Sequence, residues 1–208
     1  MKEMTISAVC TDALRGMDLS AVEAALPGRA ERARRFRQES DRLLCLGAGY
    51  LMMLAVGIRR ESDLRLGEHG KPYAPGFPAF SISHSGIWCI LASGDHRLIG
   101  ADMEAVNRAH LDAAPAVYTP AELDWMAEDP LIRFFRLWTW KESVMKATGL
   151  GMSLEPGRFE VLPFARGESL RLFGRNWYAA GGSLGGYIFS VCADEPIGPL
   201  RWVGYPLP

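Results

Sequence analysis

The chain has 208 residues, a length that suits one large domain or two small ones of about 100 residues each. Hydrophobic residues make up 49% and charged residues 23%, so the chain can bury a core and is not intrinsically disordered. The formal net charge of −1 gives no global reason to expect nucleic acid as a partner, so an anionic ligand needs local clusters of basic residues.

The cysteines and the apolar segments indicate in which cellular compartment the protein is expected. Four cysteines lie far apart without a CxxC or Cys/His pairing, which disfavours a zinc or redox motif and predicts buried thiols in a reducing cytoplasm. Charged residues come too soon after Met1 for a signal peptide, and the longest apolar run, 43–58, is too short to cross a bilayer. We therefore expect a cytoplasmic protein without a membrane partner.

In the first half, one strand precedes three helices and three further strands, expected at 4–10; 19–26, 29–37 and 40–56; 80–83, 88–92 and 98–103. The helix at 40–56 is apolar almost all round, so other elements should cover it. Gly57 fits its C-cap, and the prolines of 67–78 predict an irregular loop.

In the second half, Thr119 begins a helix with Pro120 next and Glu122 three residues on, a capping-box pattern. A longer helix is expected over 130–148, and strands over 159–162, 170–173, 177–180, 187–193 and 201–204. The segment GIWCILASGD at 86–95 resembles GYIFSVCADE at 186–195. The pattern predicts an α+β fold of two similar lobes, 1–103 and 104–208, packed as one structural unit.

Three acidic residues and a lysine form the strongest chemical signal. Asp102 and Glu104 are two apart in a predicted strand, so both side chains project to the same side. A cation between them relieves their repulsion, and Mg²⁺ suits carboxylates combined with phosphates. On the next long helix, Glu142 and Lys146 share a face. The set is typical of phosphate chemistry, although ordinary solvated charges explain each pair taken alone.

Three further signals are weaker. His84 lies between two serines at a strand end, where an imidazole, hydroxyls and backbone amides are available to an anion. Lys71 stands at the mouth of the proline-rich loop, and Arg29 and Arg32 share one helical face. A solvated loop and a solvated helix side are the alternative interpretations. A serine hydrolase is disfavoured because the sequence shows no carboxylate placed to orient His84.

Together these motifs resemble the Sfp-type 4′-phosphopantetheinyl transferases. The matching segments are PGRAERARRF (27–36), Gly70-Lys71-Pro72, FSISHSG (80–86), IGADMEAV (99–106) and FFRLWTWKESVMKATGLG (134–151). The resemblance implies two pseudo-symmetric α+β lobes with a ligand cleft between them. It also implies transfer of the 4′-phosphopantetheine moiety of coenzyme A to a serine of an apo acyl- or peptidyl-carrier protein, with release of 3′,5′-ADP.

The resemblance also assigns roles to residues. Asp102, Glu104 and Glu142 are implied as ligands of Mg²⁺, with Mn²⁺ as the alternative. For coenzyme A, the 3′-phosphate contacts would be His84, Ser83, Arg29, Arg32 and Lys71, and the pyrophosphate contacts Lys141 and Lys146. Asp102, Glu142 and Lys146 would be catalytic, with Glu142 as candidate base and Lys146 acting on the departing phosphate.

Two other functions remain as alternatives. A metal-dependent nuclease also uses clustered carboxylates and a lysine, but it normally adds a basic face for nucleic acid. A non-catalytic coenzyme A or nucleotide-binding module has little need for all three carboxylates. We expect a monomer, since two similar lobes in one chain remove an obvious need for self-association.

Overall fold

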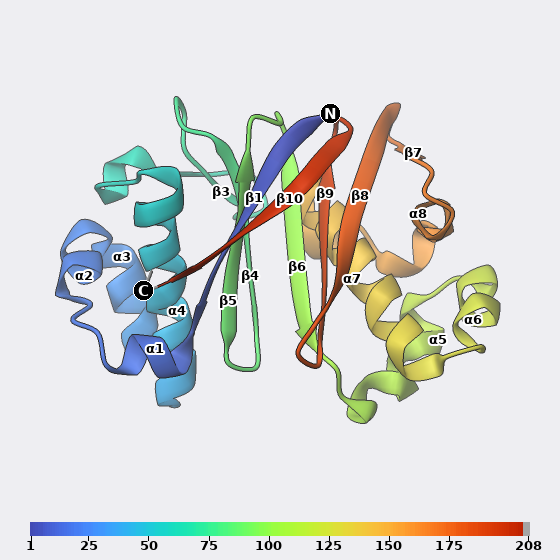
Figure 1. Cartoon of the computed structure of the whole chain (residues 1–208), viewed down its shortest axis with the longest axis horizontal. Helices are drawn as coiled ribbons and strands as arrows, with labels where there is room; N and C mark the ends of the chain where they lie inside the picture. The colour runs from blue at the N-terminus through green and yellow to red at the C-terminus, as the bar shows by residue number, and fades with distance from the viewer. Residues whose placement is uncertain (206–208) are drawn as a thin grey trace.

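The computed structural model describes residues 1–205, and its strands form two four-stranded sheets that stand side by side (Figure 1). The first sheet has the order β10-β1-β5-β4, and its strands are β1 (Lys2–Cys10), β4 (Ala79–Ser85), β5 (Trp88–Gly94) and β10 (Ile197–Tyr205). The second has the order β6-β9-β8-β7, and its strands are β6 (Ile99–Ala105), β7 (Leu170–Leu172), β8 (Arg175–Leu184) and β9 (Tyr187–Ala193). A small ribbon pairs β2 (Arg65–Leu66) with β3 (Pro72–Tyr73).

Helices cover the outer face of each sheet (Figure 1). The first sheet carries α1 (Thr11–Arg15), α2 (Ser20–Ala25), α3 (Pro27–Arg34) and α4 (Glu39–Leu51), the last extended by the π-helix η1 (Met52–Val56). The second carries α5 (Ala114–Val117), α6 (Pro120–Met126), α7 (Pro130–Thr148) and α8 (Leu162–Ala165). Short 3₁₀ helices are η2 (Glu61–Asp63), η3 (Arg108–Ala113), η4 (Gly151–Ser153) and η5 (Pro156–Arg158). The α+β class is confirmed.

Three apolar clusters hold these layers together. Leu14, Leu44 and Leu91 belong to the cluster between the first sheet and its helices, and Val144 and Cys192 to the matching cluster of the second. A third cluster lies between the sheets, with members from both, namely Met4, Ile6, Ala8, Ile90, Ala92, Ile99, Ala101, Met103, Phe189, Val191 and Ala193. The two lobes therefore share a core.

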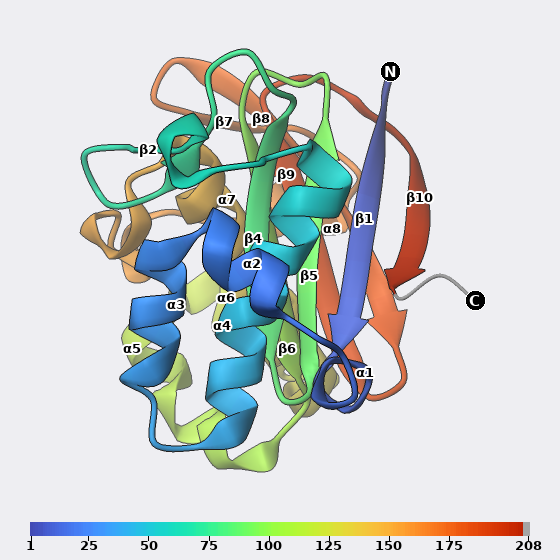
Figure 2. The ribbon, with the colours of Figure 1, turned by 90° about the vertical axis from the view of Figure 1, so that its left-hand side faces the viewer.

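The sheets interleave the two predicted segments 1–103 and 104–208. The division at 103 and 104 falls inside β6, which pairs along its whole length with β9. From the other end of the chain, β10 returns to the first sheet and pairs parallel to β1, with Ile6 opposite Trp202. Figure 2 shows both arrows pointing the same way. The observed lobes are thus groups of strands and not two consecutive stretches of chain.

The long helix α7 begins and ends where the sequence predicts, over 130–148. The Asp129 side chain accepts a hydrogen bond from the Ile132 amide, Pro130 is the first helical residue, and Gly149 ends the helix at φ 77°. The helix packs directly on β6 because Gly100 has no side chain. A Cβ at Gly100 would lie 1.8 Å from the Ser143 carbonyl oxygen.

The short elements were predicted less well. The capping box is confirmed: Thr119 accepts from the Glu122 amide, while the Glu122 carboxylate accepts from the Thr119 amide. The strand predicted at 159–162 is wrong, because the chain there turns into α8. Phe159 and Val161 are buried beneath the helices of the second lobe, so their apolar character reflects core packing and not strand pairing.

Candidate active site

Asp102 lies at the seam between the two sheets and is only 2% exposed. Its Oδ1 accepts hydrogen bonds from the Lys146 ammonium at 2.6 Å and from the Ser83 hydroxyl at 2.8 Å. Its other oxygen, Oδ2, is buried and has no hydrogen-bond partner within residues 1–205. Buried carboxylate oxygens are normally satisfied, so this unpaired oxygen indicates that a cationic or donor ligand belongs there.

Glu104, two residues further along β6, projects to the same side as the sequence predicts. Its Oε2 accepts a hydrogen bond from the Ser85 hydroxyl at 2.7 Å. Burial raises the pKa of Glu104 and the negative charge of Asp102 raises it further, while the bond from Ser85 opposes both effects. The strand thus holds two carboxylates that repel each other.

Helix α7 adds the third carboxylate from the facing side. Burial raises the pKa of Glu142; the ammonium of Lys146 lowers it, and the charges of Asp102 and Glu104 raise it again. For Lys146, burial lowers the pKa, but the charge and hydrogen bond of Asp102 outweigh burial and raise it. The structure therefore brings Asp102, Glu104, Glu142 and Lys146 into one electrostatic group, as expected from their spacing.

This donor set fits a divalent cation. Oxygen ligands, an unpaired buried carboxylate oxygen and mutual repulsion among three acids are what a bound Mg²⁺ would satisfy. Across the residues that the structure describes, no three His, Cys, Asp or Glu side chains are already gathered closely enough to hold a metal ion. At present the ammonium of Lys146 supplies the positive charge beside Asp102.

A second group of basic residues lines a pocket of about 200 Å³ next to this site. Arg29, Arg32 and His84 all line it, from α3 and β4. Arg29 donates to the Cys45 carbonyl oxygen at 3.2 Å, which fixes its side chain against α4. His84 also lines this pocket, and partial burial together with the charges of Lys146, Arg32 and Arg29 lowers its pKa. Such a surplus of positive charge suits an anion.

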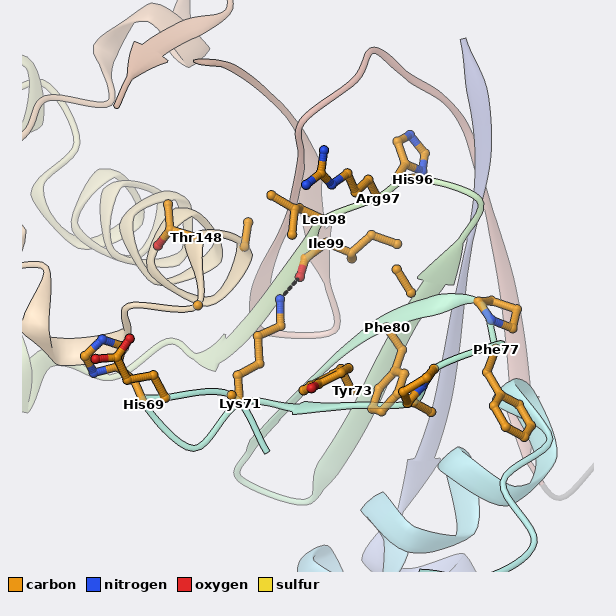
Figure 3. Close-up of a pocket in the computed structure, with 18 of the residues that line it drawn as sticks. His69, Lys71, Tyr73, Phe77, Phe80, His96, Arg97, Leu98, Ile99 and Thr148 are labelled. Atoms are coloured by element: carbon orange, nitrogen blue, oxygen red, sulfur yellow. Dashed lines mark hydrogen bonds between the residues drawn. The ribbon is translucent and has the colours of Figure 1, made fainter. Parts of the chain in front are cut away.

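Lys71 lies apart from those three residues. Its ammonium donates to the Ile99 carbonyl oxygen at 2.7 Å, and the side chain lines a pocket of about 620 Å³ (Figure 3). It also lines a smaller pocket of about 230 Å³ together with Lys146 and Gly149. Burial lowers the pKa of Lys71 to about 8, although the nearby Cys192 and Asp194 oppose this effect. A role in binding coenzyme A stays a prediction for Lys71.

Two predicted ligand contacts lie elsewhere than beside the basic pocket: Ser83 points to the acidic group, and Lys141 points away from it. Ser83 and His84 are neighbours on β4, so their side chains leave opposite faces of the sheet, and the Ser83 hydroxyl points to Asp102. Lys141 precedes Glu142 on α7 and therefore points about 100° away around the helix. It is fully buried and lies 2.8 Å from Glu122. Lys141 therefore serves a buried ion pair, whereas the Ser83 hydroxyl lies beside both Asp102 and Lys146.

Two further residues have roles at this site that were not predicted from the sequence. Ser85 holds Glu104, and the signal was the repeat of serine at every second position of β4. Trp138 lies one turn before Glu142 and, with Glu104 and Phe135, lines a pocket of about 270 Å³. An apolar pocket beside the carboxylates offers space for an uncharged part of a ligand.

Known proteins are similar to parts of this chain. The model of the 4′-phosphopantetheinyl transferase superfamily matches residues 98–192. The chain is 34% identical over 146 residues to the 4′-phosphopantetheinyl transferase Sfp of Bacillus subtilis, covering 65% of each chain. The resemblance to Sfp-type 4′-phosphopantetheinyl transferases is confirmed. The 4′-phosphopantetheinyl transferase AcpT of Escherichia coli is 38% identical over 95 residues, which are 42% of this chain and 49% of that protein.

The matches cover only parts of the proteins concerned. This chain spans less than two thirds of the length of the phosphopantetheinyl transferases that it matches. The segment matched by the superfamily model contains Asp102, Glu104, Glu142 and Lys146, whereas the basic pocket residues precede it. Within residues 1–205, none of the helices combines the length and the apolar character that crossing a membrane requires.

Proposed function

We propose that the chain transfers the 4′-phosphopantetheine moiety of coenzyme A to a serine of an apo acyl- or peptidyl-carrier protein, releasing 3′,5′-ADP. The observation that carries this proposal is the mutual electrostatic influence of Asp102, Glu104, Glu142 and Lys146, together with the unpaired buried oxygen of Asp102. The similarity to 4′-phosphopantetheinyl transferases supports the same conclusion.

The basic pocket next to the carboxylates would receive the nucleotide end of coenzyme A. Arg29, Arg32 and His84 line a pocket of about 200 Å³, which offers positive charge to the 3′-phosphate. Lys71 and Lys146 both line a neighbouring pocket. This arrangement supports contacts of both ammonium groups with the remainder of the nucleotide. The pocket beside Trp138 is apolar on one side and would accept the pantetheine arm.

The residues of the cleft would move one proton during the transfer. The serine oxygen of the carrier forms a bond to the phosphorus that carries phosphopantetheine, and the bond from that phosphorus to the oxygen of 3′,5′-ADP breaks. Glu142 accepts the serine proton, directly or through a water molecule. Lys146 stabilises the charge on the departing phosphate oxygen.

Asp102, Glu104 and Glu142 would hold Mg²⁺, with Mn²⁺ as the alternative. When bound, the metal would neutralise charge on the pyrophosphate oxygens. We propose further that the chain is a monomer and that it acts in the cytoplasm. One chain supplies both sides of the cleft, and its four cysteines are free thiols, which suits a reducing compartment.

The direct test incubates the purified chain with coenzyme A, Mg²⁺ and an apo carrier protein, followed by the intact mass of the carrier. We expect the mass to rise by one phosphopantetheine group and Asp102→Ala to lower the rate by at least about a hundredfold. Asp12→Ala is the control, because Asp12 pairs with Arg15 on the surface. Binding of coenzyme A without transfer would indicate a binding module, and salt-sensitive cleavage of DNA a nuclease. Wild-type turnover by Asp102→Ala would remove the metal assignment.

A further inference from the structure

Three serines of β4 face the free edge of β6. Strand β4 is the last strand of the first sheet and β6 the first strand of the second, so two sheet edges meet here. Ser81, Ser83 and Ser85 occupy every second position of β4, and their side chains therefore leave the same face. Phe80, Ile82 and His84 alternate with them and face the helices of the first lobe.

Each hydroxyl accepts a hydrogen bond from a backbone amide of β6, twenty residues further along the chain. The Ala101 amide donates to Ser81 at 2.9 Å, the Met103 amide to Ser83 at 3.3 Å and the Ala105 amide to Ser85 at 3.0 Å. Side chains thus satisfy amides that a neighbouring strand would otherwise pair, and the three serines join the two sheets. We call Ser81, Ser83 and Ser85 the serine ladder.

Two members of the serine ladder make a second contact. A hydroxyl that accepts from a backbone amide still has one proton to donate. Ser83 donates to Asp102 at 2.8 Å and Ser85 donates to Glu104 at 2.7 Å. Ser81 lies opposite Gly100 and Ala101, where β6 has no carboxylate. The same type of contact between the sheets therefore exists with and without a link to an acidic side chain.

We propose that Ser83 and Ser85 are positioning residues, whose hydroxyls orient the carboxylates of Asp102 and Glu104 by linking them to the β6 backbone. The inference rests on the proposed function, because the oriented carboxylates are those assigned to the metal. Each carboxylate is held at one oxygen by a hydroxyl whose own position is set by an amide of the same strand, which leaves the other oxygen of Asp102 unpaired. Loss of the Ser85 hydroxyl frees the Glu104 carboxylate to rotate, whereas Asp102 keeps its bond to Lys146.

Ser81 supplies a matched control for this proposal. Ser81→Ala and Ser85→Ala each remove one hydroxyl and its bond from a β6 amide, and only Ser85→Ala also removes a bond to a carboxylate. We expect the two variants to lose similar amounts of stability in urea. We expect Ser85→Ala alone to bind Mn²⁺ 10–100-fold more weakly by calorimetry and to lower kcat similarly, because residues that orient metal ligands have effects of this size. Ser85→Thr keeps a hydroxyl and should recover both quantities.

The measurements separate the two hypotheses. If the wild-type chain binds Mn²⁺ but modifies no carrier protein, the proposed function fails, and the affinities of the three variants still test the serine ladder. If the wild type modifies the carrier but Ser85→Ala matches Ser81→Ala in Mn²⁺ affinity and kcat, the positioning role is overturned. It is overturned as well if Ser85→Thr behaves like Ser85→Ala, or if the wild type does not bind Mn²⁺.

Discussion

Lys141 and Glu122 form an ion pair that solvent does not reach. The ammonium of Lys141 lies 2.8 Å from the Glu122 carboxylate and donates to the carbonyl oxygens of Pro156 and Phe159. Glu122 in turn accepts from the amides of Thr119 and Val161. Burial lowers the pKa of Lys141, and the charge of Glu122 opposes this effect. Every partner in the group is needed, since charges in a protein interior are tolerated only when paired.

The first prediction concerns this ion pair. Lys141→Met leaves the Glu122 carboxylate buried without its cation, so we expect the free energy of unfolding to fall by about 3–5 kcal/mol. Urea unfolding at neutral pH measures it. Lys2→Met is the matched control, because Lys2 pairs with Glu195 at the surface with its side chain 43% exposed, and should cost less than about 1 kcal/mol. Equal losses in the two variants would contradict the prediction.

The second prediction follows from the lowered pKa of Lys71. Burial moves this pKa from 10.5 to about 8 in the folded chain. Between these two values the unfolded lysine still binds a proton that the folded lysine has released, so stability rises with pH in that window. We expect the wild type to gain about 1–3 kcal/mol relative to Lys71→Met between pH 7 and pH 10. Urea unfolding of both proteins across this range measures the difference, and a constant difference would refute the lowered pKa.

At the residue scale, simple periodicity predicted which acidic side chains share a face. Alternation placed Asp102 and Glu104 on one side, and a four-residue step placed Lys146 beside Glu142. The same alternation puts Ser83 and His84 on opposite faces of β4, and the helical step turns Lys141 away from Glu142. The assignment of Ser83 and Lys141 as contacts of coenzyme A did not apply these two rules. That Lys146 pairs with Asp102 depends on how α7 lies on β6, which no local pattern contains.

At the scale of elements, the distance between α7 and β6 depends on Gly100. An added Cβ would lie 1.8 Å from the carbonyl oxygen of Ser143 and 2.5 Å from the amide nitrogen of Ala147. These neighbours are backbone atoms of a helix and have no other rotamer to adopt. Only movement of the helix relieves the overlap, and that movement would take Glu142 and Lys146 away from Asp102.

The third prediction tests this contact. We expect Gly100→Ala to lower the free energy of unfolding by at least about 3 kcal/mol and to weaken Mn²⁺ binding. Gly16→Ala is the control: a Cβ there meets no atom within 4 Å, and its φ of −91° suits alanine. The control should stay within about 0.5 kcal/mol of the wild type in urea. A Gly100→Ala variant as stable as this control would show that α7 packs further from β6.

Strong local signals predicted the elements, while pairing between distant segments was not predictable. Caps and turns located α6 and α7. Nothing near 201–204 indicates that this strand pairs in parallel with β1, because parallel pairing depends on the whole path of the chain. The serine ladder escaped notice for the same reason, since its partners lie twenty residues away.

At the scale of the whole molecule, the lobes are joined in three ways. The central apolar cluster takes side chains from both sheets, and the serine ladder joins β4 to β6. In addition, β10 lies beside β1 while its Trp202 packs edge-on against Phe189 of β9, with ring centroids 4.8 Å apart. Neither lobe can unfold without exposing apolar surface of the other.

The fourth prediction is therefore a single unfolding transition. Chains of more than about 150 residues often unfold in steps, so size alone predicts two transitions for 208 residues. The shared core predicts one, with far-UV circular dichroism and tryptophan fluorescence coinciding in urea. Leu14→Ala in the first lobe and Val144→Ala in the second should each shift the whole curve, since both side chains are at most 1% exposed. Two resolved transitions, with each variant moving only one of them, would show that the lobes are independent.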